Sequence, residues 1–269
     1  MRLAIRHRTA YEYGGTMGLV LERLRLWPRS DTSQEVIAWE VRVEGGSEQA
    51  RFRDAHGNRM ALYAMDEHAD ALRIEVGGEV ETRVADGVLG ETEGPPLWLY
   101  RRPTPLTAPQ EGAARLAARF EPSDALGSLH RLSDAIRESV AYEIGATGPT
   151  TSAEEALALG RGVCQDHAHA FLAAARLAGV PARYVSGYLK MNDRDNQDAT
   201  HAWAEAHVAG LGWVGFDVSN GYSPDERYVR LAVGLDYRDA APVSGLVRGT
   251  RSEALTVTLS VRQMQQSQQ

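Results

Sequence analysis

The chain has 269 residues, 43% of them hydrophobic and 24% charged, so it is long enough to bury a substantial core in one or two domains. The 29 basic and 36 acidic residues give a formal net charge of −7, which argues against a general binder of nucleic acids or anionic membranes. The single cysteine excludes an internal disulfide, and this fits a reducing compartment.

The N-terminal stretch MRLAIRHRTAYEYG lacks the apolar run of about 7–15 residues that forms the centre of a signal peptide. No run elsewhere approaches the roughly 20 apolar residues of a membrane span. We therefore expect a cytoplasmic protein without a membrane partner.

Residues 1–93 are predicted to form a β-rich domain. The stretch 36–43 (VIAWEVRV) alternates apolar and polar residues, as a half-buried strand does. Residues 72–84 predict a hairpin, because Gly77-Gly78 can supply the positive φ of a two-residue turn. Several short antiparallel strands indicate an antiparallel, sandwich-like domain.

A proline-rich linker is predicted over residues 94–109, with prolines at 95, 96, 103, 105 and 109 that deny regular structure. Beyond it, residues 110–269 are predicted to form a functional core that ends in a weakly alternating C-terminal β tail. The period changes here from 2 to 3.6, and the fold class is therefore α+β, with helices packed on an antiparallel sheet.

Three helices are expected in this core. The first covers 126–140, the second opens with a Ser152–Glu155 capping box and closes at Gly160, and the third runs from about 164 to 177. Strand-like segments follow at 183–189, 201–208 and 213–218.

The only cysteine, Cys164, lies where the third helix begins. Unpaired backbone N–H groups and the positive end of the helix dipole favour a nucleophilic thiolate there. Gly160 and Gly162 leave space for a substrate backbone, and the N–H of Cys164 could point at an oxyanion. On position alone, a small buried hydrophobic residue is the more ordinary reading of a lone cysteine.

A thiolate nucleophile needs a base and a group that orients the base. Residues 201–217 offer both, since a hairpin centred on Ala209 would place His201 directly opposite Asp217. A register slip of two residues would leave them diagonal neighbours that still reach each other. The sequence thus predicts an Asp217 carboxylate that orients the His201 imidazole.

Two segments, GRGVCQDHAHAFLAAARLAGVPARYVSGYL and THAWAEAHVAGLGWVGFDVSNG, resemble the transglutaminase-like core, a branch of the papain-like cysteine enzymes. Cys164, His201 and Asp217 fall on the three catalytic positions of its motifs. The first 85 residues, with HRTAYEY and DAHGN, are similar to the β-rich N-terminal domain of bacterial members, and the segment YVRLAVGLDYRDAAPVSGLVRG is similar to the same subfamily. One departure is Val218-Ser219, where relatives commonly carry Pro-Thr.

Other residues near the motifs have both functional and structural interpretations. Gln165 could contribute to an oxyanion hole or be a solvated first-turn residue, and Tyr188 could line the pocket or pack. Trp203 is more typical of hairpin core than of a substrate platform. Glu205 could brace the site by hydrogen bonding.

A metal site is not expected. His167 and His169 could combine with Cys164 and with His201 or His207, but no CxxC, HExxH or second thiol is present. No calcium-loop pattern occurs either, and no cofactor is predicted.

The resemblance implies an enzyme whose Cys164 thiolate forms a thioester from a peptide or side-chain amide. Water would then give hydrolysis, as in a peptidase or amidase, and an amine would give transamidation. Two other readings remain open, a non-catalytic peptide-binding module and a zinc protein. The expected partner is a peptide or protein substrate, and the oligomeric state is left undetermined.

Overall fold

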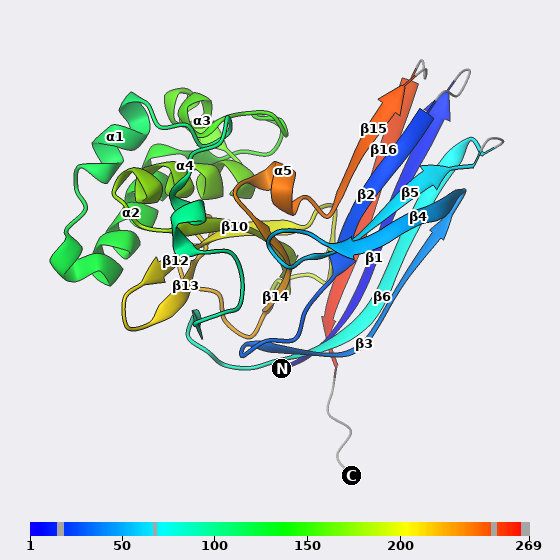
Figure 1. The fold of residues 1–269 in the computed structure, drawn as a ribbon, viewed down its shortest axis with the longest axis horizontal. Helices are drawn as coiled ribbons and strands as arrows, with labels where there is room; N and C mark the ends of the chain where they lie inside the picture. The colour runs from blue at the N-terminus through cyan, green and yellow to red at the C-terminus, as the bar shows by residue number, and fades with distance from the viewer. Residues whose placement is uncertain (15–18, 67–68, 249–251, 265–269) are drawn as a thin grey trace, which may run out of the picture.

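The computed structural model describes residues 1–14, 19–66, 69–248 and 252–264, with only the backbone described at 252–253 (Figure 1). A β-sandwich lies beside a core of helices packed on a sheet, so the predicted α+β class is confirmed. In the described part of the chain, no helix has the length and apolar character needed to cross a membrane.

The sandwich consists of two antiparallel sheets. Their strand orders are β11-β16-β1-β6-β3 and β15-β2-β5-β4. Leucine, isoleucine, valine and tyrosine side chains from both inner faces form its buried core. The strands are β1 (Arg2–Gly14), β2 (Leu19–Trp27), β3 (Gln34–Glu44), β4 (Gly46–Arg53), β5 (Arg59–Met65), β6 (Ala71–Thr82), β11 (Asn196–Gln197), β15 (Val243–Arg248) and β16 (Ser252–Gln263).

The sequence division at residue 110 predicts that the C-terminal strands form a tail of the core. In the structure they belong to the sandwich instead. β16 pairs with β1 from Leu3↔Gln263 to Gly14↔Ser252, and β15 pairs with β2. Figure 1 shows these orange and red strands lying among the blue and cyan ones. The alternation of the C-terminal segment is real, but it buries Leu259 and Val261 in the sandwich. The core is therefore inserted between strands of one sandwich.

The core sheet has the order β14-β10-β12-β13-β7, with every pairing antiparallel. Helices cover one of its faces, and a short parallel pair, β8-β9, lies next to the helix that carries Cys164 (Figure 1). The strands are β7 (Val88–Gly90), β8 (Ala141–Tyr142), β9 (Arg161–Gly162), β10 (Ala182–Leu189), β12 (His201–Val208), β13 (Gly212–Phe216) and β14 (Tyr228–Gly234). The helices are η1 (Leu97–Arg101), α1 (Glu111–Ala117), η2 (Pro122–Asp124), α2 (Ala125–Ser139), α3 (Ala153–Leu159), α4 (Cys164–Leu177) and α5 (Tyr237–Ala240).

Local sequence explains the helix boundaries. The Ser152 hydroxyl accepts the N–H of Glu155 while the Glu155 carboxylate accepts the N–H of Ser152, so the predicted capping box opens α3. Gly160, at φ +68, ends α3 in the left-handed region that glycine favours. Alanine dominates α4, which lets the helix lie close to the alanine face of β12.

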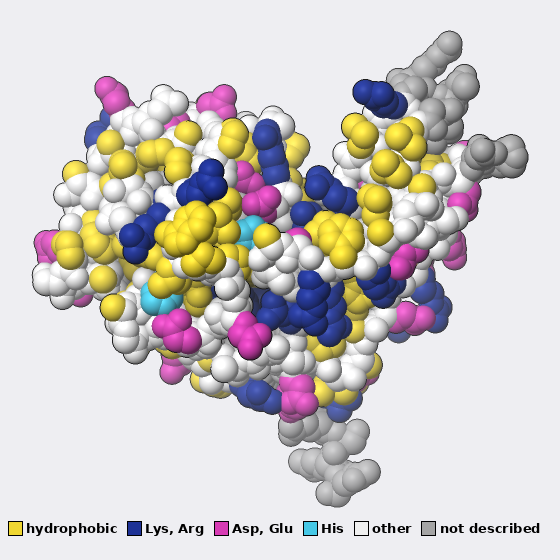
Figure 2. Space-filling model, in the orientation of Figure 1, with side chains coloured by type: hydrophobic (Ala, Val, Ile, Leu, Met, Phe, Trp, Pro, Cys, Tyr) yellow, Lys and Arg dark blue, Asp and Glu magenta, His cyan; other side chains and the backbone are white. Residues whose placement is uncertain are grey.

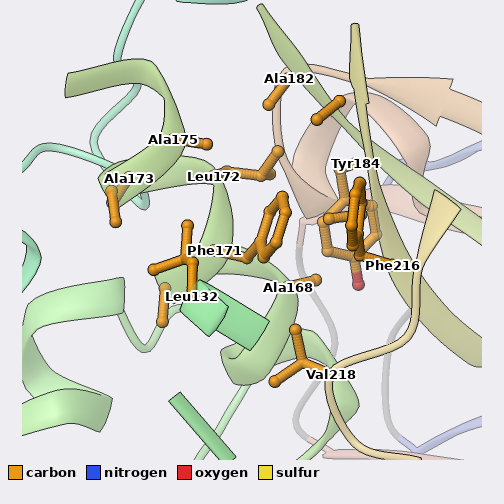
Figure 3. Packing of buried hydrophobic residues seen from close by; sticks show 14 of the residues in the cluster. Leu132, Ala168, Phe171, Leu172, Ala173, Ala175, Ala182, Tyr184, Phe216 and Val218 are labelled. Carbon is orange, nitrogen blue, oxygen red and sulfur yellow. The ribbon is translucent and has the colours of Figure 1, made fainter. Parts of the chain in front are cut away.

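Aromatic and aliphatic side chains fill the space between α4 and the sheet (Figure 3). The rings of Phe171 and Phe216 stack with centroids 5.0 Å apart, and Leu132 of α2 closes the cluster from the other side of the helix. This packing fixes α4 against the hairpin formed by β12 and β13.

The predicted hairpin at Gly77-Gly78 is wrong, because β6 runs straight through both glycines. A Cβ on Gly78 would come within 2.2 Å of the Trp39 ring. The glycine therefore serves the close approach of a neighbouring side chain on β3, and not a turn.

Two amide side chains of the sandwich pair with the outer edge of the core sheet, at β14. Gln34 accepts the N–H of Arg230 at 2.7 Å and donates to its carbonyl at 2.9 Å. Asn58 does the same with the N–H and carbonyl of Val233, at 2.9 and 2.7 Å. The edge strand is therefore covered, and the two parts of the molecule are joined by backbone-directed hydrogen bonds.

Candidate active site

Cys164 is the first residue of α4, as predicted, and its side chain is partly exposed. Asp166, in the same first turn, accepts the N–H of Val163 at 2.8 Å and the Thr147 hydroxyl at 2.5 Å. These bonds fix the approach of the chain to the helix. The backbone N–H of Cys164 is among the first-turn groups that have no acceptor inside the helix.

His201 and Asp217 meet through the β12–β13 hairpin, but not in the predicted register. The observed pairs, from Ala204↔Phe216 to Val208↔Gly212, are shifted by two residues from the pairing that would set His201 opposite Asp217. The two side chains are diagonal neighbours, and His201 Nε2 lies 2.6 Å from Asp217 Oδ2.

Asp217 takes one ring nitrogen of His201, Nε2, and Cys164 lies close enough to act on the pKa of the ring. Burial alone would lower the pKa of His201. The charge and hydrogen bond of Asp217, together with Cys164, overcome this and raise that pKa to about 10. The His201 ring is therefore an imidazolium at neutral pH, placed between a thiol and a carboxylate.

Asp217 is fully buried and ionised. Burial raises its pKa, but the charge of His201 and hydrogen bonds from His201, Tyr228 and Asn220 lower it overall. The Tyr228 hydroxyl donates to Oδ2 at 2.6 Å and the Asn220 side-chain amide donates to the same oxygen at 2.7 Å. The carboxylate is thus held by several donors besides the histidine.

Gln165 and Gly162 take up structural positions. The Gln165 side-chain amide donates to the carbonyl of Pro149 at 3.4 Å, so the protein already provides it with an acceptor. Gly162 lies in β9, where a Cβ would come within 2.7 Å of the Asp166 carboxylate. Its missing side chain makes room for that carboxylate, and the approach of a substrate backbone at this glycine stays a prediction.

Trp203 and Tyr188 are fully buried. The Trp203 ring stacks near His201, with centroids 6.3 Å apart, and meets the Tyr228 ring edge-on at 5.3 Å. It therefore supports the histidine and does not form an exposed platform. The Tyr188 hydroxyl hydrogen-bonds His7 at 3.1 Å within the core of the sandwich, so Tyr188 does not line the site.

The three histidines considered as metal ligands, His167, His169 and His207, are engaged elsewhere. His167 uses both ring nitrogens, toward the Ser219 hydroxyl and the Val140 carbonyl, each at 2.8 Å. His169 is buried and accepts the N–H of Tyr237, and His207 pairs with Glu91. Within the described ranges, no group of three or more His, Cys, Asp or Glu side chains is arranged to hold a metal ion.

Glu205 does not contact Cys164, His201 or Asp217, although it follows His201 on the same strand. Its buried carboxylate lies 2.6 Å from Arg183 Nε and 2.7 Å from Arg230 Nε. Arg230 also pairs with Asp31 of the sandwich at 2.6 Å. The sequence suggested that Glu205 braces the site, but in the structure it stabilises the junction between the core and the sandwich.

The sequence did not reveal Asn220 or Tyr228. Asn220 carried a weak signal, because an Asn three residues after an Asp can fold back on it in a turn. Tyr228 carried none, since eleven residues separate it from Asp217 and only the pairing of β14 with β10 brings it back.

One surface of the molecule is shown in Figure 2. Lys and Arg side chains gather on it where the helical part meets the sandwich, although the chain as a whole carries a formal charge of −7. The acidic excess is therefore distributed unevenly over the protein.

A thiol at a helix N-terminus, next to an imidazole that a buried carboxylate orients, defines the site of a cysteine-based enzyme. The chain belongs to the transglutaminase-like superfamily. Residues 114–218 match that superfamily, and residues 3–81 match the bacterial transglutaminase-like N-terminal region.

Similar proteins cover almost the entire chain. "Uncharacterized protein ML0607" of Mycobacterium leprae is 30% identical, over 98% of this chain and 99% of its own. "Uncharacterized protein Rv2569c" of Mycobacterium tuberculosis is 28% identical, over 97% and 91%. The crystal structure of a "Putative Cysteine Protease" from Cytophaga hutchinsonii has a TM-score of 0.74 at 20% identity and covers 97% of this chain and 98% of that one. The fold, including the placement of the sandwich around the core, is thus shared.

Proposed function

We propose that the protein is a cysteine peptidase or amidase that acts on peptide or protein substrates through a thioester. The observation that carries this proposal is the grouping of Cys164, His201 and Asp217: Asp217 holds one ring nitrogen of His201 at 2.6 Å, and Cys164 lies close enough to raise the pKa of the ring. A His201 ring with a pKa of about 10 keeps its proton at neutral pH, which favours a thiolate–imidazolium pair.

In the first half of the reaction, the thiolate attacks the amide carbonyl carbon, a C–S bond forms and the carbonyl oxygen becomes an oxyanion. The backbone N–H of Cys164 is placed to donate to that oxygen. The His201 imidazolium then gives its proton to the amide nitrogen, the C–N bond breaks, and a thioester and a free amine result.

In the second half, neutral His201 takes a proton from water as the oxygen attacks the thioester. The C–S bond breaks, a carboxylic acid leaves, and the thiolate–imidazolium pair is restored. An amine in place of water would form a new amide by the same steps, so transamidation is the alternative outcome of one mechanism.

A digest of a peptide library with and without an added primary amine, read by mass spectrometry, tests the proposal. We expect hydrolysed peptides from the wild type, few amine adducts and no products from Cys164→Ala. Amine adducts as the main products would instead identify a transamidase. Equal product yields from wild type and Cys164→Ala would overturn cysteine catalysis altogether.

A further inference from the structure

Three donors converge on one oxygen of Asp217. His201 Nε2, the Tyr228 hydroxyl and the Asn220 side-chain amide lie 2.6, 2.6 and 2.7 Å from Oδ2. The Asn220 backbone N–H takes the other oxygen, Oδ1, at 3.3 Å. The carboxylate is completely buried, so these donors replace the water that would otherwise solvate it.

We propose that Tyr228 is a positioning residue, which fixes the orientation of the Asp217 carboxylate and spreads its charge, and so limits how strongly Asp217 holds the protonated His201. The proposal rests on the proposed function, because it assigns Tyr228 a part in the same site. Tyr228 touches neither the thiol nor the reacting atoms, so it is not a catalytic residue.

The position of Tyr228 is fixed from both sides along the chain. Two residues before Tyr228, the carbonyl of Glu226 accepts a hydrogen bond from the Thr82 hydroxyl at 2.5 Å. Two residues after it, the side chain of Gln34 hydrogen-bonds both the N–H and the carbonyl of Arg230. Both anchoring side chains belong to the sandwich. The Trp203 ring packs edge-on against the Tyr228 ring, and the hydroxyl is therefore aimed at Asp217 by the fold.

The chemical consequence follows from charge. A carboxylate oxygen that already accepts two neutral donors has less negative charge to offer to a third. If the Tyr228 hydroxyl is removed, more of that charge acts on His201, and the imidazolium becomes harder to deprotonate. A general acid that binds its proton too firmly delivers it more slowly to the leaving amine.

Other ionisable groups near the pair do not take over this role. Burial lowers the pKa of His167, so it is neutral, and burial raises the pKa of Tyr142, so it too is neutral. The ionisable groups that face Asp217, His201 or Tyr228 are Cys164 and His167 on α4, Tyr142 on β8, Tyr222 in the loop after Asp217, and Arg227, which pairs with Asp225. None of them lies within hydrogen-bond distance of Asp217 Oδ2 in the described structure.

The test follows His201 directly, by titration of its ring nitrogens in ¹⁵N NMR, in wild type and in Tyr228→Phe. We expect the pKa of His201 to rise by about half a unit or more in the variant. Asn220→Ala removes a donor from the same oxygen and should shift the pKa in the same direction. Because both variants act on one oxygen, their double variant should shift it by less than the sum.

Tyr188→Phe is the matched control, since it deletes a hydroxyl from another buried tyrosine, whose partner is His7. Tyr188→Phe should leave the His201 titration unchanged. If Tyr228 had a purely structural role, Tyr228→Phe would leave it unchanged as well. An unchanged or lowered His201 pKa in both Tyr228→Phe and Asn220→Ala would overturn the proposal. A wild-type His201 with an ordinary pKa would instead refute the thiolate–imidazolium pair, so the two failures are distinguishable.

Discussion

Glu205→Gln is expected to destabilise the protein by ~3 kcal/mol, because it removes the negative charge between the buried Arg183 guanidinium and the largely buried Arg230 guanidinium. Breaking a buried ion pair from one side typically costs about 3–5 kcal/mol, since a charge is left without compensation. Arg230 keeps its 2.6 Å contact with Asp31, which places the expected loss at the lower end. Arg183 keeps the Thr92 hydroxyl at 3.2 Å and the rings of Trp213 and Tyr100, at 3.9 and 6.0 Å.

Urea unfolding followed by tryptophan fluorescence measures this loss, because Trp213 lies directly against Arg183. Glu79→Gln is the control, since Glu79 pairs with Arg2 at 2.5 Å but both side chains are solvent-accessible. Exposed pairs contribute about 0–1 kcal/mol, so this variant should stay close to wild type. The slope of the unfolding free energy with urea should be the same for all three proteins.

A loss below ~1 kcal/mol for Glu205→Gln would refute the reasoning. A double variant separates the effect of the lost charge on stability from the effect of the changed packing. Arg183→Met combined with Glu205→Met leaves no uncompensated charge, because Arg230 still pairs with Asp31, and should be more stable than Glu205→Met alone. Iodoacetamide should react with Cys164 at the wild-type rate in folded Glu205→Gln, since Glu205 does not contact the site.

Three further outcomes are expected. Cys164→Ala, His201→Ala and their double variant should lose peptidase activity to similar extents, with Asp217→Asn milder, whereas independent multiplicative losses would show that these residues do not act as a unit. Alkylation of Cys164 by iodoacetamide should stay fast at pH 6 in wild type and slow markedly in His201→Ala, and an identical rate in both would contradict the ion pair. Burial lowers the pKa of His7 to about 4, against about 6.5 in the unfolded chain. As pH falls from 6.5 toward 4, the unfolded chain takes up a proton that folded His7 does not, so the free energy of unfolding should fall by about 3 kcal/mol. Urea unfolding at pH 7, 6 and 5 should show this loss in wild type and a flatter profile in His7→Gln, and parallel profiles would argue against it.

Local sequence predicted the elements whose determinants are local. The helix start at Cys164, the capping box of α3 and the Gly160 terminus were all readable, because each depends on residues within one turn. The hairpin that joins His201 to Asp217 was also readable, but its register was not. The three-residue connection between Val208 and Gly212 shifts the pairing by two, and such loop geometry is only weakly encoded.

Features that depend on distant parts of the chain escaped prediction. Gly77-Gly78 has the composition of a turn, and only the position of Trp39 shows why the strand continues. Tyr228 and Gln34 are unremarkable in the sequence, since their importance comes from partners that the tertiary fold supplies. The C-terminal strands alternate as strands should, but nothing local says which sheet they join.

The pairing of β1 with β16 also has a consequence for synthesis of the protein. About 180 residues separate the end of β6 at Thr82 from the end of β16 at Gln263, which ribosomes making about 5–20 residues per second need roughly 10–40 s to add. Throughout that time one edge of β1 lacks its partner, while the residues of the core are being added. The nascent chain must therefore protect an open edge strand, and the sandwich closes only after its catalytic insert has been made.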